Sequence, residues 1–282
     1  MKILCIGDVV GKPGRRMLAD HLRRLIQDHH VDLVVCNGEN AAGGSGITPQ
    51  IFRKLLHYGV DVVTLGDHVY RKGEITTVMG TSDRIVRPAN LGDRAVGRRW
   101  TVVPTKDDRH PVAVTCLLGQ LYMQPADSPW RTVEQVFQEI PSEVAIRVVD
   151  FHAEASSEKI AMGWLLNGRA SIVFGTHTHI PTADASILDG GTAHISDLGM
   201  TGPYDSILGR RKERVLQYLT TAMPTPFLVA TGDPRLYGLL VEVEPETGKA
   251  IGIEQLAIKG TVRDEQDSPP AQQDKPAEPD EA

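Results

Sequence analysis

The sequence predicts an α/β layered fold, in which a sheet is sandwiched between helices. Short, nearly continuous apolar runs recur along the 282 residues, and amphipathic segments lie between several of them. Continuous rather than alternating hydrophobicity is typical of strands that are covered on both faces. The alternation of such strands with helices indicates a layered α/β architecture, and the chain is long enough to bury a sizeable core.

Eight apolar runs are predicted to be strands. They are KILCIG at 2–7, DLVVCNG at 32–38, VDVVTLG at 60–66, VAVTCLLG at 112–119, AIRVVDF at 145–151, ASIVFG at 170–175, AHISDLG at 193–199 and LYGLLVEVE at 236–244. The last run is expected to be half-exposed and to pair with AIGIEQLAIKG across the turn PETGKA.

Three helices are predicted between these runs. Residues 14–30 carry leucines three or four positions apart on one face. Thr48 followed by Pro49 is the signal of a helix start, and Gly59 suits the C-terminal end of that helix. Ser157 is expected to cap a third helix that ends at Gly168.

Composition predicts the domain organisation. Residues 1–262 are expected to form one folded domain. Residues 263–282 are acidic and rich in proline, with no large apolar residue, so a disordered tail is expected there. Between about 70 and 130, the stretches RPANLGDRAVGRRW and LYMQPADSPW are irregular. They favour a small cap or lid over a site, and a loose surface excursion is the alternative.

Composition also limits the location and the partners. The net charge of −6 offers no basic surface for long nucleic acids or anionic membranes. The first residues are too polar for a secretion signal, and no apolar run approaches the length of a membrane span. The three cysteines are far apart in apolar runs, which favours a reducing compartment. We therefore expect a cytoplasmic protein.

Polar side chains follow five of the predicted strands. In open α/β sheets, ligands collect beyond the carboxyl ends of the strands. At these ends the sequence places Asp8, Glu39, Asn40, Asp67, His68, His152, His177 and His179. Turns use glycine, asparagine, proline and aspartate and have no need of four histidines, so turn chemistry does not explain the set.

Imidazole and carboxylate ligands without a thiolate suit iron, manganese, zinc, nickel or cobalt. All of these residues except His68 are candidate ligands, and seven are too many for one tetrahedral ion with an open position. They suit two ions that share a carboxylate, an arrangement that clamps a phosphoryl group and activates water. His68 adjoins a ligand without being needed as one, so it is the candidate proton donor. The stretch AAGGSGIT beside Glu39 is either a pliable loop or a turn.

Several motifs together resemble the YmdB-type branch of the calcineurin-like metallophosphoesterases. They are IGDVVGKPGR, NGENAAGG, TLGDH, VRPAN, DFHAEASSEK, GTHTHIPTAD and DLGMTGPYDSILG, spread from residue 6 to about 209. The resemblance implies a four-layer α/β/β/α sandwich with a dinuclear centre at the strand ends. On matching positions, it implies one metal held by Asp8, Glu39, Asn40 and His179, a second held by Glu39, Asp67, His152 and His177, and His68 as the proton donor.

The same resemblance implies an activity, the hydrolysis of small phosphodiesters such as 2′,3′-cyclic nucleotides. A metal-activated hydroxide is expected to attack phosphorus while His68 protonates the leaving oxygen. The expected cofactors are two divalent or trivalent ions per chain, iron first, with manganese or zinc as alternatives. A homo-oligomer is also implied. The alternative is a regulatory protein whose metal site senses a ligand with little turnover, and another dinuclear hydrolase, such as an amidohydrolase, is a third hypothesis.

One position departs from the family pattern, which reads G-N-H where this chain reads Gly66-Asp67-His68. An aspartate can still bind a metal through oxygen, but it adds a negative charge where an anionic substrate must bind. Such a charge raises the pKa of a nearby water nucleophile, so we expect a shifted metal preference or pH optimum, and weaker activity. Arg87 and Asp127 are expected either to touch substrate or to serve as ion-paired scaffolding.

Overall fold

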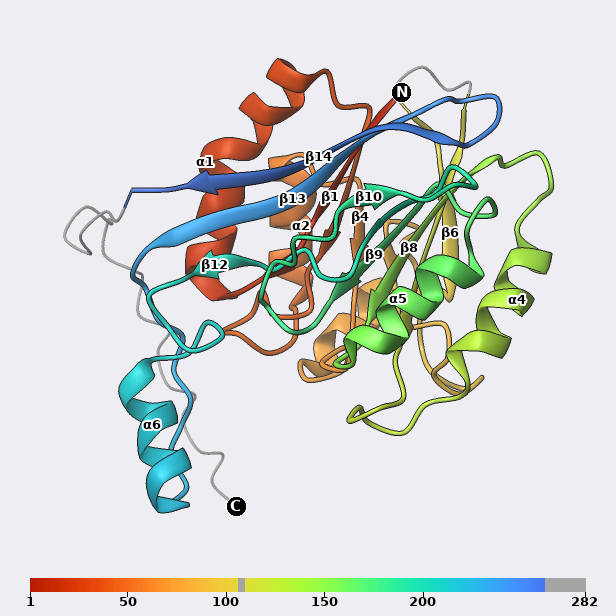
Figure 1. The fold of residues 1–282 in the computed structure, drawn as a ribbon. Helices are drawn as coiled ribbons and strands as arrows, with labels where there is room; N and C mark the ends of the chain where they lie inside the picture. The colour runs from red at the N-terminus through yellow and green to blue at the C-terminus, as the bar shows by residue number, and fades with distance from the viewer. Residues whose placement is uncertain (106–109, 262–282) are drawn as a thin grey trace, which may run out of the picture.

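Two facing β-sheets with helices on their outer sides make up the described part of the chain (Figure 1). The structure, a computed structural model, describes residues 1–105 and 110–261. The expected tail at 263–282 and the predicted domain end at residue 262 lie outside the described residues.

The bounds of the elements are as follows. The helices are α1 (Gly11–His29), α2 (Pro49–Tyr58), α3 (Thr76–Met79), α4 (Pro129–Glu139), α5 (Ser156–Leu165) and α6 (Lys212–Thr221), with a 3₁₀ turn at Gly73–Ile75. The strands are β1 (Lys2–Ile6), β2 (Asp8–Val9), β3 (Leu33–Asn37), β4 (Val62–Thr64), β5 (Ile85–Val86), β6 (Trp100–Val103), β7 (Val112–Leu118), β8 (Ile146–His152), β9 (Ile172–Thr176), β10 (Ser186–Ile187), β11 (Ala193–Ile195), β12 (Met200–Pro203), β13 (Pro234–Val243) and β14 (Ala250–Lys259).

The first sheet has the strand order β2-β12-β13-β1-β3-β4-β5, and β14 pairs with β13. β1, β3, β4 and β5 are parallel, so their carboxyl ends lie at one edge of the sheet. β13 runs antiparallel to β1 and forms the predicted hairpin with β14. The expectation that this run is half-exposed is wrong, because β13 lies between β1 and β14 and is mostly buried.

The second sheet has the order β10-β11-β9-β8-β7-β6. Its inner strands β7, β8, β9 and β11 are parallel, whereas β6 and β10 are antiparallel strands at the two edges. Parallel strands that are buried on both faces account for the continuous apolar runs in the sequence.

Three apolar cores separate four layers, and they confirm the α/β/β/α sandwich. The first core lies between the first sheet and the helices α1 and α2, and it takes Leu4 and Ile6 from β1. The alternate residues Ile3 and Cys5 face the second core, where the two sheets pack together. The third core lies between the second sheet and the helices α4 and α5. Figure 1 shows α1 and α2 on one side of the sheets and α4 and α5 on the other.

The predicted ends of α2 are confirmed, whereas the predicted start of α5 is wrong. Thr48 Oγ1 accepts from the backbone N–H of Ile51 (3.2 Å), and Gly59 ends α2 with a φ of 114°. The prediction that Ser157 caps the third helix is wrong. The N-cap position of α5 is Ala155, two residues earlier than predicted, and it provides no side-chain hydrogen bond.

Residues 70–130 supply strands to both sheets. β5 lies at the edge of the first sheet, while β6 and β7 belong to the second. A covering role for part of this segment stays a prediction.

The three cysteines are buried and form no disulfide; Cys5 lies in β1, Cys36 in β3 and Cys116 in β7. No helix among residues 1–105 and 110–261 combines the length and the apolar character that crossing a bilayer requires.

Candidate metal centre

The predicted polar residues gather at one edge of the two sheets. β1, β3 and β4 of the first sheet and β8 and β9 of the second end there, and the side chains that follow these strands meet. Three groups place their ligand atoms within 4.8 Å of one another: Asp67–His152–His177, Asp8–Glu39–His152 and Glu39–Asp67–His68. Hydrogen-bond contacts add Asn40 and His179 to the same cluster. All eight predicted residues are thus brought together.

Asp67, His152 and His177 form one half of the cluster. Nε2 of His152 lies 3.0 Å from Asp67 Oδ1 and 3.0 Å from His177 Nδ1, and His177 Nδ1 lies 3.5 Å from Asp67 Oδ1. Ligands bound about 2.1 Å from one tetrahedral ion lie about 3.4 Å apart, so these spacings fit a shared cation.

Asp8, Asn40 and His179 form the other half. Nδ2 of Asn40 lies 3.5 Å from Asp8 Oδ1 and 3.2 Å from His179 Nε2. Nδ1 of His179 donates to the carbonyl of Leu208 (3.1 Å), which directs the other ring nitrogen toward the cluster. Histidines that bind metals commonly donate their second N–H in this way.

Glu39 lies between the two halves and is only 1% exposed. Its Oε1 is 3.3 Å from His152 Nε2 and 3.0 Å from Asn40 Nδ2, so it contacts a member of each half. Its Oε2 accepts from the backbone N–H of His68 at 3.0 Å. This central position suits a carboxylate shared between two ions.

His177 and His179 are held in a strained turn directly after β9. Their φ angles are 97° and 64°, in the left-handed region that favours glycine. Such backbone conformations cost about 1–3 kcal/mol each and occur preferentially at functional sites. In a regular strand the two side chains would share one face. The turn instead brings His177 to Asp67 and His179 to Asn40.

A buried hydrogen-bond chain orients His152 from behind. Thr176 Oγ1 donates its only hydrogen to Asp150 Oδ1 (2.6 Å), so it accepts from His152 Nδ1 (2.8 Å). Asp150 also accepts from Asn37 Nδ2 and from the Thr64 hydroxyl. With a proton fixed on Nδ1, His152 presents Nε2 to the cluster, as a metal ligand must.

The cluster concentrates negative charge. Burial raises the pKa of Asp8. Burial acts to raise the pKa of Glu39 and Asp67 as well, but contacts with His152 outweigh it and hold both pKa values well below their usual range. Burial would lower the pKa of His152, but the charge of Glu39 overcomes this and the pKa lies well above its usual value. A hydrogen bond to Glu39 raises the pKa of His68.

The donor set therefore fits metal ions. Within the described residues, the ion pairs of Asp8, Glu39 and Asp67 are made with histidines and with no lysine or arginine. Buried carboxylates without a fixed cation are costly, and a bound ion would remove that cost.

Three residues that the sequence reasoning did not single out also support the site. Lys159 Nζ lies 2.6 Å from Asp197 Oδ2, and both side chains are 2% exposed. The same Oδ2 accepts from the backbone N–H and the hydroxyl of Thr178, the residue between the two histidines. Glu154 lines the cavity and lies 3.2 Å from His177 Nε2. Glu154 and Lys159 belong to the motif DFHAEASSEK, and Asp197 begins the motif DLGMTGPYDSILG. Membership in these family motifs is the one feature of the sequence that pointed to them.

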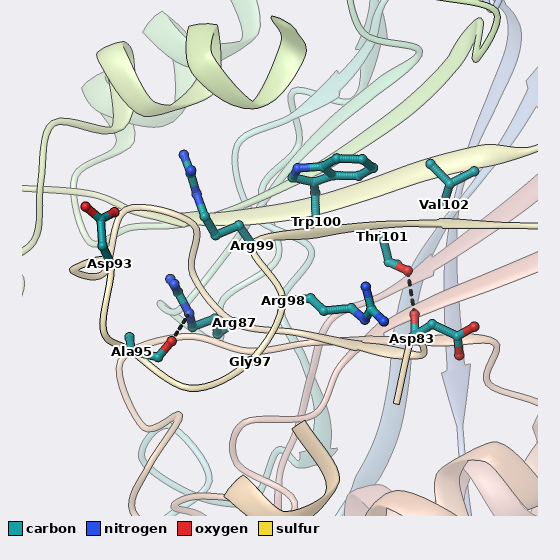
Figure 2. A pocket seen from close by; sticks show the side chains of 10 residues that line it. All are labelled: Asp83, Arg87, Asp93, Ala95, Gly97, Arg98, Arg99, Trp100, Thr101 and Val102. Atoms are coloured by element: carbon teal, nitrogen blue, oxygen red, sulfur yellow. Dashed lines mark hydrogen bonds between the residues drawn. The ribbon is translucent and has the colours of Figure 1, made fainter. Parts of the chain in front are cut away.

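Arg87 and Asp127 do not line the cavity beside the cluster, and neither makes an ion pair within the described residues. The Arg87 guanidinium is buried and donates to backbone carbonyls, among them Ala95 (3.2 Å). Figure 2 shows Arg87 in a separate pocket, with its hydrogen bond to Ala95. The backbone carbonyl of Asp127 accepts from Asn90 Nδ2, and its backbone N–H donates to the carbonyl of Asn90 (2.9 Å each).

Comparison with known proteins places this arrangement in a family. The fold is similar to that of a phosphatase whose structure is solved, and residues 4–256 match the family of YmdB-like proteins. The chain belongs to this YmdB-like family.

Individual relatives cover nearly the whole chain. The 2′,3′-cyclic-nucleotide 2′-phosphodiesterase of Bacillus subtilis (strain 168) is 42% identical over 258 residues, which are 92% of this chain and 97% of that protein. The crystal structure of a hypothetical protein from Thermus thermophilus is similar with a TM-score of 0.86 and 36% identity, over 93% of this chain and 100% of that one. A phosphatase from Mycoplasma pneumoniae has a TM-score of 0.86 and 30% identity, over 92% and 93%.

Proposed function

We propose that this protein is a metal-dependent phosphodiesterase that hydrolyses 2′,3′-cyclic nucleotides. The observation that carries the proposal is the convergence of carboxylate, amide and imidazole side chains from five strands in one cluster. Part of this cluster, including Glu39, His68 and His177, lines a cavity of about 330 Å³. The Bacillus subtilis relative, at 42% identity over 92% of this chain, supports the same substrate class.

We propose two ion sites within the cluster. Asp8, Asn40 and His179 would hold one ion, Asp67, His152 and His177 the other, and Glu39 both. Asn40 directs Nδ2 to the cluster in this structure, so ligation through its oxygen requires a half-turn of the amide. Oxygen and nitrogen ligands without a thiolate suit iron, manganese or zinc. When bound, such ions supply positive charge for the phosphoryl oxygens and lower the pKa of the attacking water.

His68 is proposed as the proton donor to the leaving ribose oxygen. It lines the cavity, and its side chain is 26% exposed, so a substrate can reach it. The backbone N–H of His68 donates to Glu39 Oε2 at 3.0 Å, which holds the residue beside the cluster. General acids placed in this way contribute about 10²–10⁴-fold to a rate.

The test is turnover of 2′,3′-cyclic AMP and bis(p-nitrophenyl) phosphate after loading with iron, manganese or zinc. We expect hydrolysis of the cyclic nucleotide. We expect His68→Ala to lose about 10²-fold or more of kcat while it keeps the wild-type metal content. His21→Ala on α1, away from the cluster, is the matched control and should keep full activity. Absence of turnover with every metal and ester would support the regulatory alternative, and turnover of amides instead of esters would support an amidohydrolase.

We further propose a cytoplasmic location, because the three cysteines are buried and unpaired. Small substrates are proposed rather than long nucleic acids, because the net charge is −6. A homo-oligomer stays a prediction, which light scattering in solution tests.

A further inference from the structure

The cavity over the cluster has a polar part and an apolar part. The polar part is the cluster itself. The apolar part comes from the chain around α6 and consists of Ile207, Leu208, Val215 and Phe227. A phosphoryl group and its metal ions need only polar partners, so the apolar wall suits a different portion of a ligand.

The wall is fixed directly against the cluster. The carbonyl of Leu208 accepts from His179 Nδ1 at 3.1 Å, so one wall residue touches a proposed metal ligand. The Arg210 guanidinium donates to the carbonyls of Gly43 and Gly44, in the loop that follows Asn40, and to the carbonyl of Phe227 (3.0 Å). Arg210 therefore ties the glycine-rich loop to the wall, and three of its five N–H groups are used in these contacts with backbone carbonyls.

Phe227 presents an aromatic ring at the cavity. Its ring packs edge-to-face on Tyr218 of α6, with centroids 5.5 Å apart and an interplanar angle of 83°. Phe227 nevertheless stays 42% exposed and Leu208 47% exposed. A fixed aromatic ring with exposed apolar area beside a phosphoryl site is suited to stacking a flat ring of a ligand.

We propose that Ile207, Leu208, Val215 and Phe227 form a nucleobase subsite in which the base stacks on Phe227. The inference rests on the proposed phosphodiesterase function. In a 2′,3′-cyclic nucleotide, one ribose carries the phosphate on C2′ and C3′ and the base on C1′, so a base subsite must adjoin the phosphate site. The apolar wall adjoins the proposed phosphate site in this way, because Leu208 contacts His179. Stacking tolerates every base, and the larger purine rings gain more contact than pyrimidines.

A different surface, formed by α6 and the residues just after it, is apolar without lining the cavity. Leu216, Leu219 and Met223 are 52%, 69% and 61% exposed, and Figure 1 shows α6 projecting from the two-sheet body. Leu219 therefore provides a matched control, an apolar residue on the same helix outside the proposed subsite.

The experiment compares two substrates in three variants. The substrates are 2′,3′-cyclic AMP and the 2′,3′-cyclic phosphate of methyl riboside, which lacks a base. Phe227→Ala should lower kcat/KM for the nucleotide by about 5- to 150-fold and leave the base-free substrate within twofold. Phe227→Tyr should restore the nucleotide rate, and Leu219→Ala should match wild type on both substrates. Wild type should also prefer cyclic AMP and GMP to cyclic CMP and UMP.

A binding measurement separates this inference from the proposed function. Calorimetry with 2′,3′-cyclic AMP and with the base-free cyclic phosphate, in the His68→Ala background with and without Phe227→Ala, reports the subsite whether or not the protein turns over substrate. Weaker binding by the same factor supports the subsite even if hydrolysis fails. Equal losses for both ligands, or no loss for either, overturn it. A change of oligomeric state in Phe227→Ala with unchanged nucleotide binding would assign the wall to protein contact instead.

Discussion

Replacement of Gly66 by alanine should disrupt the cluster without removing any proposed ligand. A β-carbon on Gly66 would lie 2.3 Å from Glu39 Oε2 and 2.3 Å from His152 Nε2. Because real β-carbons essentially never approach heavy atoms closer than 3.0 Å, each atom must retreat by at least 3.0 − 2.3 = 0.7 Å. Gly66 does not have a positive φ, so the substitution tests contact rather than backbone strain.

Neither atom is free to retreat. Glu39 is 1% exposed, and its Oε2 is held by the backbone N–H of His68. His152 is fully buried, and its Nδ1 is fixed by Thr176. A misplacement of about 1 Å at a reacting centre costs about 10²-fold in rate. Disturbed orientation of a ligand typically costs about 10–100-fold in metal affinity.

The assay is a metal titration against a competing chelator, together with kcat/KM for 2′,3′-cyclic AMP. We expect Gly66→Ala to bind metal about 10–100-fold more weakly and to lose about 10²-fold in kcat/KM. Gly80→Ala is the control, because the nearest atom to its β-carbon would be Thr76 O at an ordinary 3.6 Å. Metal binding and turnover of Gly66→Ala within twofold of the Gly80→Ala values would refute the reasoning.

Three other substitutions probe strain, charge burial and the departure from the family pattern. In metal-free protein, His177→Gly should be about 1 kcal/mol more stable than His177→Ala, because its φ of 97° favours glycine; equal denaturation midpoints in a chelator would contradict this. Lys159→Met leaves the buried carboxylate of Asp197 without its positive partner and should lower the free energy of unfolding in urea by about 3–5 kcal/mol. Lys212→Ala removes an exposed ion pair and is the control, which should leave the urea midpoint unchanged. Asp67→Asn removes a negative charge from the proposed metal site, which would lower the pKa of a metal-activated water there, so the acid limb of the pH–rate profile should move to lower pH. An unchanged profile with unchanged metal content would end that explanation.

The positions of the site residues could be predicted because they depend on local sequence. Asp8, Asp67 and His152 each stand at or just beyond the carboxyl end of a parallel strand, and such ends meet at one edge of a sheet. Which half of the cluster each residue joins was implied only by the family resemblance. His177 and His179 join different halves because both have positive φ angles, which cannot be predicted from the residue type histidine.

The supporting contacts could not be predicted in the same way. Lys159 lies within α5 and Asp197 in the loop after β11, and their meeting depends on how that helix packs on the second sheet. α6 was also missed, because residues such as Leu216 and Leu219 face solvent and give no periodic buried stripe. Since α6 carries part of the cavity wall, the sequence located the chemistry of the site but not the surface proposed to select its substrate.

The number of metal ions bound per chain tests the central proposal most directly. Elemental analysis of protein purified without oxygen should find about two ions per chain. The double variant His152→Ala/His177→Ala should lose one of them and keep the ion proposed beside Asp8. Fewer than one ion per wild-type chain, or an undiminished count in the double variant, would contradict the assignment of this cluster as a dinuclear centre.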